Sequence, residues 1–348
     1  MSDKIKIDPG VSILYALKLM DKIRRKLLIV VEGGKYAGLL SIGDIQRAVI
    51  NNADLSGPVR GIMRSDYIVA GPADSIDEVR SMMLQIRSEF MPVVDGDRNI
   101  IKVWFWEDVF GEKKPESRKQ FSLPVVIMAG GRGSRLKPLT NVLPKPLIPI
   151  GEKTMLEEIF DRFAVCGCSN FYISVSYKAD LIEYYIRKLN LPWTIRFFEE
   201  PRPLGTAGSL GLLKGKIEST FFVTNCDILI DHDYSEILDY HREQGNEITV
   251  VAALKHFPLA YGTIETGENG QMAELTEKPE LTFKINSGMY ILEPGIINEI
   301  RADEPLNVTD LITRLKAEGR RVGVYPVSQN SWTDIGDWKE YLSMVTGR

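Results

Sequence analysis

From residue 123 onward, short apolar runs alternate with amphipathic stretches along the chain. Runs rich in β-branched and aromatic residues predict strands at 123–129, 170–176, 194–198, 220–226 and 247–255. Between these runs, apolar residues at helical spacing predict helices near 154–166, 178–189, 205–214 and 233–244. Such alternation predicts an α/β fold with a mixed, mainly parallel sheet, whose ligands bind at the carboxyl ends of the strands.

The N-terminal third of the chain repeats itself. Residues 12–31 align with residues 75–94 at a constant offset: each segment begins with Ser-Ile, carries an apolar helical stripe and ends in a short apolar strand. A glycine-containing turn follows each of them. One such unit is too small to bury a core, so we expect two repeats, of about 8–55 and 62–112, to pack together.

A charged stretch separates this repeat from the α/β region. Residues 111–122 contain Pro115 and show no apolar periodicity, which predicts a linker. A chain of 348 residues is also more typical of two domains than of one. We therefore expect a first domain of residues 1–112 and a second of residues 123–348, joined by residues 113–122.

The loop after the apolar run Val125–Met128 has an unusual composition. Residues 129–147 read AGGRGSRLKPLTNVLPKPL, in which glycines permit backbone conformations that other residues avoid and prolines interrupt regular structure. Cations are added by Arg132, Arg135, Lys137 and Lys145. A turn rich in backbone N–H groups and cations is suited to hold phosphates. The loop lacks the third glycine of a dinucleotide fingerprint and the Gly-Lys-Ser/Thr of a P-loop.

Composition and charge narrow the range of functions. The net charge of −4 gives no basic field for nucleic acid or an anionic membrane. No apolar stretch approaches the length of a membrane span, and the start MSDKIKIDPG is too polar for a secretory signal. Three sparse cysteines (Cys166, Cys168 and Cys226) suit a reducing compartment, and the C-x-C pair lacks a partner pair for zinc. We expect a cytoplasmic protein.

The motif G-G-x-G-x-R-L-x-P-L-T, followed by P-K-P-L-x-P-I, resembles the sugar-1-phosphate nucleotidylyltransferases over about 124–340. These Rossmann-like enzymes make a nucleoside-diphosphate sugar from a nucleoside triphosphate and a sugar 1-phosphate. The resemblance implies in-line attack on the α-phosphorus, with positioning and charge neutralisation as the main catalytic effects. The segment EEPRPLGTAGSL, residues 199–210, resembles the mannose-1-phosphate guanylyltransferases, which implies GTP and a mannose- or glucosamine-type sugar 1-phosphate.

The resemblance assigns catalytic and metal-binding roles. Arg135 is expected to engage the triphosphate through its planar fork, and Lys145, held between two prolines, to face the α-phosphate. Asp227, after the strand TFFVTNC, and Asp334 in WTDIGDW are expected to hold Mg²⁺. Glu293 is an alternative second ligand, and helix capping is an alternative role for Asp334. Pairing with a nearby acid on the surface is the alternative for both cations.

The resemblance also assigns contacts with the two substrates. Contacts with the nucleotide are implied for Ala129, Gly130, Gly131, Gly133, Gly205 and Thr206. Contacts with the sugar phosphate are implied for Gly262, Glu277, Lys278 and Asn286. An ordinary helix N-terminus capped by Thr206 is the alternative for the segment around Gly205.

Residues 5–112 resemble a pair of CBS domains. The resemblance implies that Ser41 and Asp44 in SIGD contact an adenine nucleotide, whereas the second repeat keeps Asp108 but has Phe105 in place of the hydroxyl residue. One nucleotide site is therefore expected. Capping of the following helix is the alternative for Ser41 and Asp44. The pair can equally serve dimerisation, and we expect a homodimer or a higher homo-oligomer.

Three classes of function remain open from the sequence. The leading hypothesis is an enzyme that activates a sugar 1-phosphate, with the CBS pair as a regulatory or assembly module. The second is a non-catalytic nucleotide or nucleotide-sugar sensor, but every charged position that the chemistry needs is occupied. The third is transfer to a non-sugar phosphate such as phosphocholine. The segments EKP and INSG favour a sugar over such a substrate.

Overall fold

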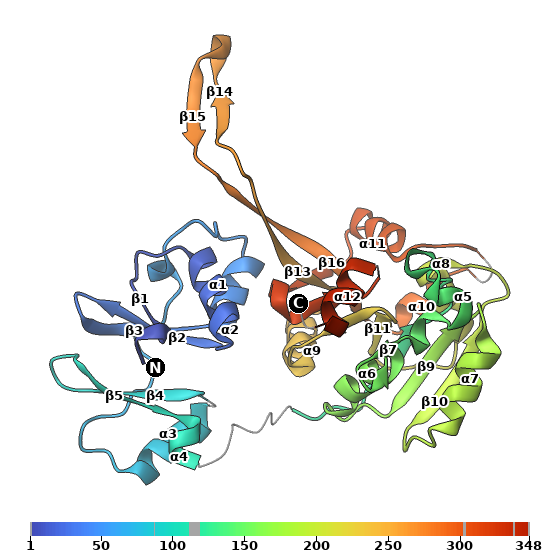
Figure 1. The fold of residues 1–348 in the computed structure, drawn as a ribbon, viewed down its shortest axis with the longest axis horizontal. Helices are drawn as coiled ribbons and strands as arrows, with labels where there is room; N and C mark the ends of the chain where they lie inside the picture. Colours follow the sequence, from blue (N-terminus) through green and yellow to red (C-terminus); the bar gives the residue numbers. More distant parts are fainter. Residues whose placement is uncertain (1, 87, 111–118, 302–303, 337, 347–348) are drawn as a thin grey trace. The chain divides into compact units, whose positions relative to one another are not determined.

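The computed structural model describes residues 2–86, 88–110, 119–301, 304–336 and 338–346 (Figure 1). The chain divides into two compact units, Met1–Ser117 and Arg118–Arg348, and each is described by itself. Residues 113–118 of the expected linker lie outside the described residues.

The first unit contains two copies of one pattern. Its elements are β1 (Lys6–Ile7), α1 (Ile13–Ile23), β2 (Leu27–Glu32), β3 (Lys35–Ser41) and α2 (Ile42–Ile50), then α3 (Ile76–Ile86), β4 (Phe90–Val94), β5 (Ile100–Phe105) and α4 (Trp106–Phe110), with 3₁₀ turns at Ser2–Ile5 and Val59–Gly61. In each copy the two central strands pair antiparallel, β2 with β3 and β4 with β5. Each copy therefore has the order helix, strand, strand, helix that its sequence predicts.

The two copies are closed in the same way. The first residue of the last helix donates its amide to a carbonyl just before the first strand, Ile42 to Lys26 at 2.8 Å and Trp106 to Glu89 at 3.0 Å. The copies also contact each other, because the Tyr36 amide donates to the Arg98 carbonyl at 2.8 Å.

The second unit is built on a seven-stranded sheet in the order β10-β9-β6-β11-β16-β13-β17. The strands are β6 (Val125–Met128), β9 (Asn170–Val175), β10 (Thr194–Glu199), β11 (Phe221–Asn225), β13 (Ile248–Pro258), β16 (Glu280–Leu292) and β17 (Val322–Val327). Neighbours are parallel except at β16, which is antiparallel to both β11 and β13. The mixed, mainly parallel sheet is thus confirmed. All five predicted strands are present, whereas β16 and β17 were not predicted.

Helices and short strand pairs complete the second unit. The pairs are β7 (Pro149–Ile150) with β8 (Lys153–Thr154), β12 (Ile228–Ile230) with β18 (Trp332–Asp334), and β14 (Thr263–Thr266) with β15 (Met272–Thr276). The α-helices are α5 (Leu139–Val142), α6 (Met155–Ala164), α7 (Ala179–Lys188), α8 (Gly205–Gly208), α9 (Tyr234–Glu243), α10 (Gly295–Glu299), α11 (Val308–Ala317) and α12 (Trp338–Thr346). Turns of 3₁₀ helix lie at Ser134–Leu136, Lys145–Leu147, Ser209–Leu213, Glu268–Gly270 and Gln329–Ser331. Within the described residues, no helix is long and apolar enough to cross a bilayer.

The centre of the sheet is covered on both faces. Phe221, Phe222 and Val223 follow one another in β11, and all three are buried, as is typical of a central strand. Helix α6 begins at a capping box in which the Glu157 amide donates to the Thr154 hydroxyl at 3.3 Å and the Thr154 amide donates to the Glu157 carboxylate at 2.9 Å. This packing gives the site at the sheet edge a rigid base.

Candidate active site

Two loops leave the carboxyl edge of the sheet side by side. Strands β6 and β11 are parallel neighbours, with Met128 opposite Asn225, so the glycine-rich loop and the turn that holds Asp227 start at the same edge. The Cys226 amide donates to the Met128 carbonyl at 3.2 Å and ties the two loops together. This is the edge at which ligands of α/β sheets bind.

Lys145 and Asp227 form an ion pair at this edge, although they lie 82 residues apart in sequence. The Lys145 ammonium donates to the Asp227 carboxylate, and the lysine is only 8% exposed. The pair of prolines around Lys145, Pro144 and Pro146, restricts the backbone of the 3₁₀ turn that presents it. A buried cation on a stiff turn is held ready for an anionic ligand.

Asp334 joins Asp227 through a small strand pair. Strands β12 and β18 pair antiparallel with Ile228 opposite Asp334, and the Ile335 amide donates to the Asp227 carbonyl at 2.9 Å. A Cβ atom built on Gly336 would lie 2.7 Å from one Asp334 oxygen and 3.4 Å from one Asp227 oxygen. The two carboxylates therefore flank the same point.

The charges at this point interact. Burial, and then the charge of Asp227, raise the pKa of Asp334 above its ordinary value. A hydrogen bond from the Gly336 amide and the charges of Lys145 and Arg135 act in the opposite direction. Arg135 itself is exposed on the 3₁₀ turn Ser134–Leu136. Both expected cations and the other expected carboxylate thus lie within electrostatic reach of Asp334.

Two carboxylates of this kind fit Mg²⁺. Like charges in a half-buried pocket repel each other, and a divalent cation relieves that repulsion. Mg²⁺ commonly takes one or two protein carboxylates and completes its shell with water and phosphate oxygens. Among the described residues, no group of three or more acidic, histidine or cysteine side chains forms a metal cluster.

The alternative assignment of Glu293 as the second metal ligand is wrong. Because β16 is antiparallel to β11, with Leu292 opposite Phe221, Glu293 lies at the opposite edge of the sheet. There it contacts Thr220 at 2.7 Å and the buried His241 ring at 3.0 Å. Burial lowers the pKa of His241, so a neutral imidazole bonded to this carboxylate is favoured.

Gly133 allows the glycine-rich loop to pack against Lys145. Its φ is +62°, and a Cβ there would lie 2.8 Å from the Thr140 methyl group and 3.0 Å from the Lys145 Cβ. The Thr140 hydroxyl donates to the Gly133 carbonyl at 2.9 Å and fixes the turn. Gly131, in contrast, faces open space, since a Cβ there would meet nothing within 4 Å.

A second loop lies beside the start of the glycine-rich loop. The Ala129 amide donates to the Ser174 carbonyl at 3.0 Å, and a Cβ on Gly130 would lie 2.8 Å from the Glu200 carboxylate. Glu200 in turn accepts hydrogen bonds from the Ser174 hydroxyl and, at 3.1 Å, from the Leu204 amide. Glu200 was not predicted from the sequence, in which the acidic pair of EEPRPLG was the available signal.

Gly205 and Thr206 begin the short helix α8. The φ of Gly205 is +72°, and a Cβ there would lie 2.8 Å from the Leu306 carbonyl, so the position requires glycine for packing. The N-cap of α8 is Leu204, and Thr206 lies within the helix. The alternative role of Thr206 as a cap is therefore wrong.

The residues expected to contact the sugar phosphate lie in two separate groups. Asn286 lies in β16 near the edge of the sheet and accepts a hydrogen bond from the Gly288 amide at 3.1 Å. A Cβ on Gly262 would lie 2.9 Å from the Glu277 carboxylate, and the Lys278 ammonium lies 4.0 Å from the other Glu277 oxygen. Glu277 and Lys278 are 72% and 68% exposed. In the described contacts, nothing joins these two side chains to the Lys145–Asp227 pair.

In the first unit, Ser41 and Asp44 form the capping box of α2. The Asp44 amide donates to the Ser41 hydroxyl at 3.2 Å, and the Asp44 carboxylate accepts from the Ser41 amide at 2.8 Å and from the Arg64 guanidinium at 2.7 Å. Burial opposes ionisation, but the hydrogen bonds from Ser41 and Arg64 hold the pKa of Asp44 below its ordinary value. Asp108 accepts from the Phe105 amide at 3.1 Å. The capping role of Ser41 and Asp44 is thus confirmed.

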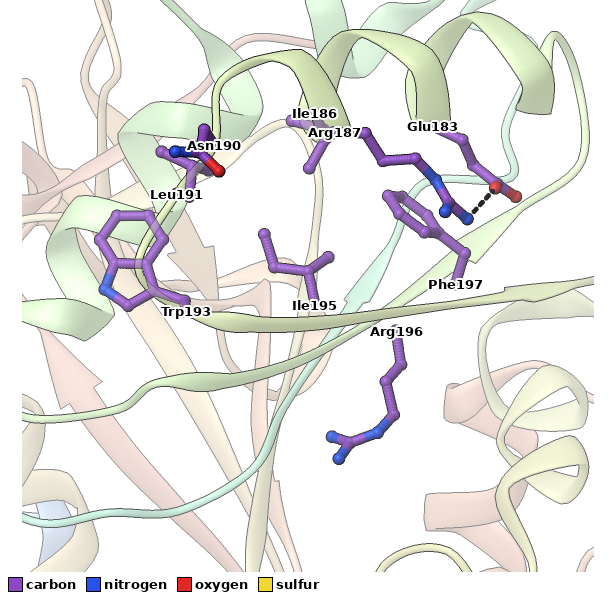
Figure 2. A pocket seen from close by; sticks show the side chains of 9 residues that line it. All are labelled: Glu183, Ile186, Arg187, Asn190, Leu191, Trp193, Ile195, Arg196 and Phe197. Atoms are coloured by element: carbon purple, nitrogen blue, oxygen red, sulfur yellow. Dashed lines mark hydrogen bonds and ion pairs between the residues drawn. The ribbon is translucent and has the colours of Figure 1, made fainter.

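A pocket of about 600 Å³ lies elsewhere, between α7 and β10 (Figure 2). Its cations already have partners, because Arg187 donates to Glu183 at 3.0 Å and Arg196 donates to Asn170. The residue after the carboxyl end of β10, Glu200, lies beside Gly130 of the glycine-rich loop. The pocket is therefore separate from the candidate site.

The cysteines are structural. Cys166, Cys168 and Cys226 are free and buried. Burial raises the pKa of both Cys168 and Cys226 to about 12, so neither is a reactive thiolate at neutral pH.

Comparison with known families agrees with this geometry. The family described as nucleotidyl transferase matches residues 124–347, and the CBS domain matches residues 1–51 and 59–110. The chain therefore belongs to the nucleotidyl transferase family and carries a pair of CBS domains.

Individual relatives share the second unit. The chain is 32% identical over 227 residues to the mannose-1-phosphate guanylyltransferase catalytic subunit beta of Drosophila pseudoobscura pseudoobscura, covering 63% of this chain and 60% of that protein. It is 30% identical over 230 residues to the mannose-1-phosphate guanyltransferase of Aspergillus oryzae, covering 64% and 63%. The chain thus spans about 60% of the length of these curated relatives.

Solved structures share the fold of the second unit. The structure of HddC from Yersinia pseudotuberculosis matches with a TM-score of 0.50 and 27% identity, covering 65% of this chain and 99% of that one. The structure described as a putative glucose-1-phosphate thymidylyltransferase from Bacillus anthracis matches with a TM-score of 0.51 and 20% identity, covering 65% and 94%. The latter supports the fold alone.

Proposed function

We propose that this protein joins a nucleoside triphosphate to a sugar 1-phosphate, releasing pyrophosphate and forming a nucleoside-diphosphate sugar. The observation that carries the proposal is the convergence of Lys145, Asp227, Asp334 and Arg135 on one sheet edge beside a glycine-rich loop. Membership of the nucleotidyl transferase family supports it.

In the proposed reaction, an oxygen of the sugar phosphate attacks the α-phosphorus of the nucleotide. A new P–O bond forms as the bond between the α-phosphorus and the bridging oxygen to the β-phosphorus breaks, and that oxygen leaves with pyrophosphate. Both reactants are anions, so charge neutralisation is the main requirement. Lys145 faces the α-phosphate from its proline-bounded turn, and the exposed Arg135 receives the leaving phosphates.

Asp227 and Asp334 would hold Mg²⁺ in this site. When bound, the ion supplies positive charge to the phosphate oxygens. Asp334 must lose its proton to act as a ligand, and Lys145 and Arg135 favour that ionised form. The glycine-rich loop positions the nucleotide, because Gly131 leaves the backbone of the loop open to a ligand.

The proposed substrates are GTP and a mannose- or glucosamine-type sugar 1-phosphate. The relatives named mannose-1-phosphate guanylyltransferases support this choice, together with EEPRPLGTAGSL in the loop beside Gly130. The free, buried cysteines support the cytoplasm as the compartment.

For the CBS pair we propose an adenine nucleotide as ligand and regulation of turnover as role. The guanidinium groups of Arg47 and Arg64, 55% and 44% exposed, flank Asp44 and offer cations to a phosphate. Addition of AMP, ADP or ATP is expected to change the rate, and Asp44→Ala is expected to remove that response. A rate that none of the three nucleotides changes would contradict regulation.

Pyrophosphate release tests the main proposal. The protein is incubated with Mg²⁺, each of the four common NTPs and a series of sugar 1-phosphates. Release with GTP and a hexose 1-phosphate is expected. Nucleotide binding without release for any pair would favour the sensor instead.

A further inference from the structure

The two expected cations lie in one loop after β6. We call residues 134–149, which include Arg135 and Lys145, the cation loop. Pro144 and Pro146 restrict the backbone around Lys145, but they do not determine where this turn lies relative to the carboxylates of the site. That place depends on contacts between the cation loop and other elements of the second unit.

Helix α12 makes two such contacts with the backbone of the cation loop. The Trp338 indole N–H donates to the Lys137 carbonyl at 2.7 Å, and the Tyr341 hydroxyl donates to the Pro149 carbonyl at 3.3 Å. These bonds join residues that lie 201 and 192 positions apart in the sequence. The last described helix of the second unit is therefore attached to the segment that follows its first strand.

The two bonds lie on either side of the Lys145 turn. Lys137 follows the 3₁₀ turn that presents Arg135, and Pro149 follows the 3₁₀ turn Lys145–Leu147 by two residues. Residues 138–148 thus lie between two points at which the cation loop is attached to α12. A change in either bond is expected to affect where the Lys145 turn lies.

The attachment is built on one face of α12. Trp338 and Tyr341 are three residues apart in the helix, so their side chains lie side by side. Their rings contact each other edge to face, with centroids 5.9 Å apart. Both side chains are half-buried. Aromatic side chains have few rotatable bonds, so this pair gives a stiffer attachment than long flexible side chains would.

A separate contact holds the middle of the cation loop. The Lys178 ammonium, at the start of α7, donates to the carbonyls of Asn141 and Val142 at 2.6 and 2.7 Å. The Tyr177 hydroxyl donates to the Thr140 carbonyl at 3.4 Å. The short helix α5 is therefore held from α7, whereas the segments on both sides of it are held from α12.

The segment before α12 also carries a carboxylate of the site. Asp334 ends β18, and α12 begins at Trp338, four residues later. Between them, the Ile335 amide donates to the Asp227 carbonyl at 2.9 Å and the Gly336 amide donates to the Asp334 carboxylate at 2.7 Å. One short segment thus connects the expected metal ligands to the attachment of the cation loop.

We propose that Trp338 and Tyr341 are positioning residues, which hold the cation loop in the place beside Asp227 and Asp334 that the reaction requires. Such a place matters for the rate, since a misplacement of about 1 Å costs about 100-fold. The inference rests on the proposed function for this catalytic effect, but not for the attachment of the loop to α12.

Two matched double variants test the proposal. Trp338→Phe/Tyr341→Phe removes both donors and keeps a ring at each position. Trp193→Phe/Tyr172→Phe makes the same two replacements elsewhere in the second unit, where the Tyr172 hydroxyl donates to the Lys216 carbonyl at 3.0 Å. The second variant therefore controls for the general effect of losing an indole and a phenol.

Pyrophosphate release measures the catalytic effect. In Trp338→Phe/Tyr341→Phe we expect kcat to fall about 10- to 100-fold, while KM for the nucleotide changes less than about 3-fold. The control variant should keep kcat within about 2-fold of the wild type. An unchanged kcat, or a loss of nucleotide affinity as large as the loss of kcat, would overturn the proposal.

Hydrogen exchange of the full chain measures the attachment without any activity. In Trp338→Phe/Tyr341→Phe we expect faster exchange of the Ile148 amide, which donates to the Lys145 carbonyl at 3.1 Å. The Leu143 amide, at the end of the helix that Lys178 holds, should exchange as in the wild type. The control variant should match the wild type at both amides. Unchanged exchange at Ile148, or faster exchange throughout the second unit, would overturn the proposal.

The outcomes separate the two proposals. Faster exchange confined to the Lys145 turn, in a protein whose wild type releases no pyrophosphate, would refute the proposed reaction and leave the attachment intact. Release of pyrophosphate with the same kcat in the wild type and in both variants would refute the positioning role and leave the reaction intact.

Discussion

At the scale of single residues, the backbone at Gly133 and the turn around Lys145 determine where the Lys145 side chain lies. Gly133 adopts a φ of +62°, and its lack of a side chain leaves room for Lys145, since a Cβ there would lie 3.0 Å from the Lys145 Cβ. The flanking prolines then restrict the turn that holds Lys145. Because its ammonium already contacts Asp227, little reorganisation is needed when an anion enters.

Replacing that lysine tests its role in the transition state. Lys145→Ala is expected to lower kcat by about 10³-fold, about 4 kcal/mol, with a smaller change in KM for the nucleotide. Steady-state pyrophosphate release measures both constants. Lys153→Ala is the control, since Lys153 is half exposed and bonds to Asp161 on the surface. An equal loss in kcat and in nucleotide affinity would limit Lys145 to binding the ground state.

Gly133 and Gly131 form a matched pair in the same loop. Gly133→Ala is expected to destabilise the second unit by about 1–3 kcal/mol, because its φ is positive and the new methyl group would clash. Gly131→Ala meets open space and should leave the free energy of unfolding unchanged within about 0.5 kcal/mol. Urea denaturation measures both. Equal stability of the two variants would contradict the packing described for this loop.

The ionisation of Asp334 makes the stability of the folded protein depend on pH. Its pKa is raised in the folded state, so the folded protein holds this proton more tightly than the unfolded chain does. Its contribution to stability is present below the ordinary pKa of 3.8 and is lost as the pH rises through the folded value. The Asp334→Asn variant has no carboxylate at this position. It therefore loses no stability here as the pH rises, and it has no repulsion with Asp227.

The Asp334→Asn variant is therefore expected to unfold at a higher temperature than the wild type at neutral pH without metal. Adding Mg²⁺ and nucleotide should raise the Tm of the wild type more than that of the variant. Thermal denaturation over a pH series measures both effects. A variant that is less stable without metal and gains as much from Mg²⁺ would contradict the shared site.

At the scale of elements, the capping box of α2 holds Ser41 and Asp44 in place. Asp44→Ala is expected to destabilise the first unit by about 1–3 kcal/mol, because it removes a cap and leaves Arg64 without its partner. Asp108→Ala, which loses one amide bond at an exposed turn, should cost about 1 kcal/mol or less. Denaturation of the full chain, monitored in the first unit, compares the two. Equal losses would contradict the buried network around Asp44.

Elements with a strong local pattern could be predicted from the sequence. The five apolar runs became strands because each buries one or both faces in the same sheet, and the box of Thr154 and Glu157 marks the start of α6. Strand β18 could not be predicted, since three residues ending at Asp334 form a strand only by pairing with β12. The error at Glu293 has the same origin, because its place depends on the direction of β16.

The pair β14 and β15 was not predicted from the sequence either, for a physical reason. None of the residues of these two strands is buried, so the short alternating runs around Ile264 and Leu275 gave no core signal. The prediction for β13 stopped at residue 255, while pairing with β16 continues to Pro258.

At the scale of the whole molecule, the second unit brings together charges from distant parts of the sequence. Lys145, Asp227 and Asp334 come from three segments that are far apart in the sequence and meet only in the folded unit. The first unit adds two CBS domains. Function thus depends on a site that no single segment contains.

The most direct measurement of the central claim is the release of pyrophosphate by the full chain with Mg²⁺, the four common NTPs and a set of sugar 1-phosphates. We predict release with GTP and a hexose 1-phosphate, abolished by Lys145→Ala and retained by Lys153→Ala. Binding of nucleotide with no pyrophosphate from any pair would contradict the account.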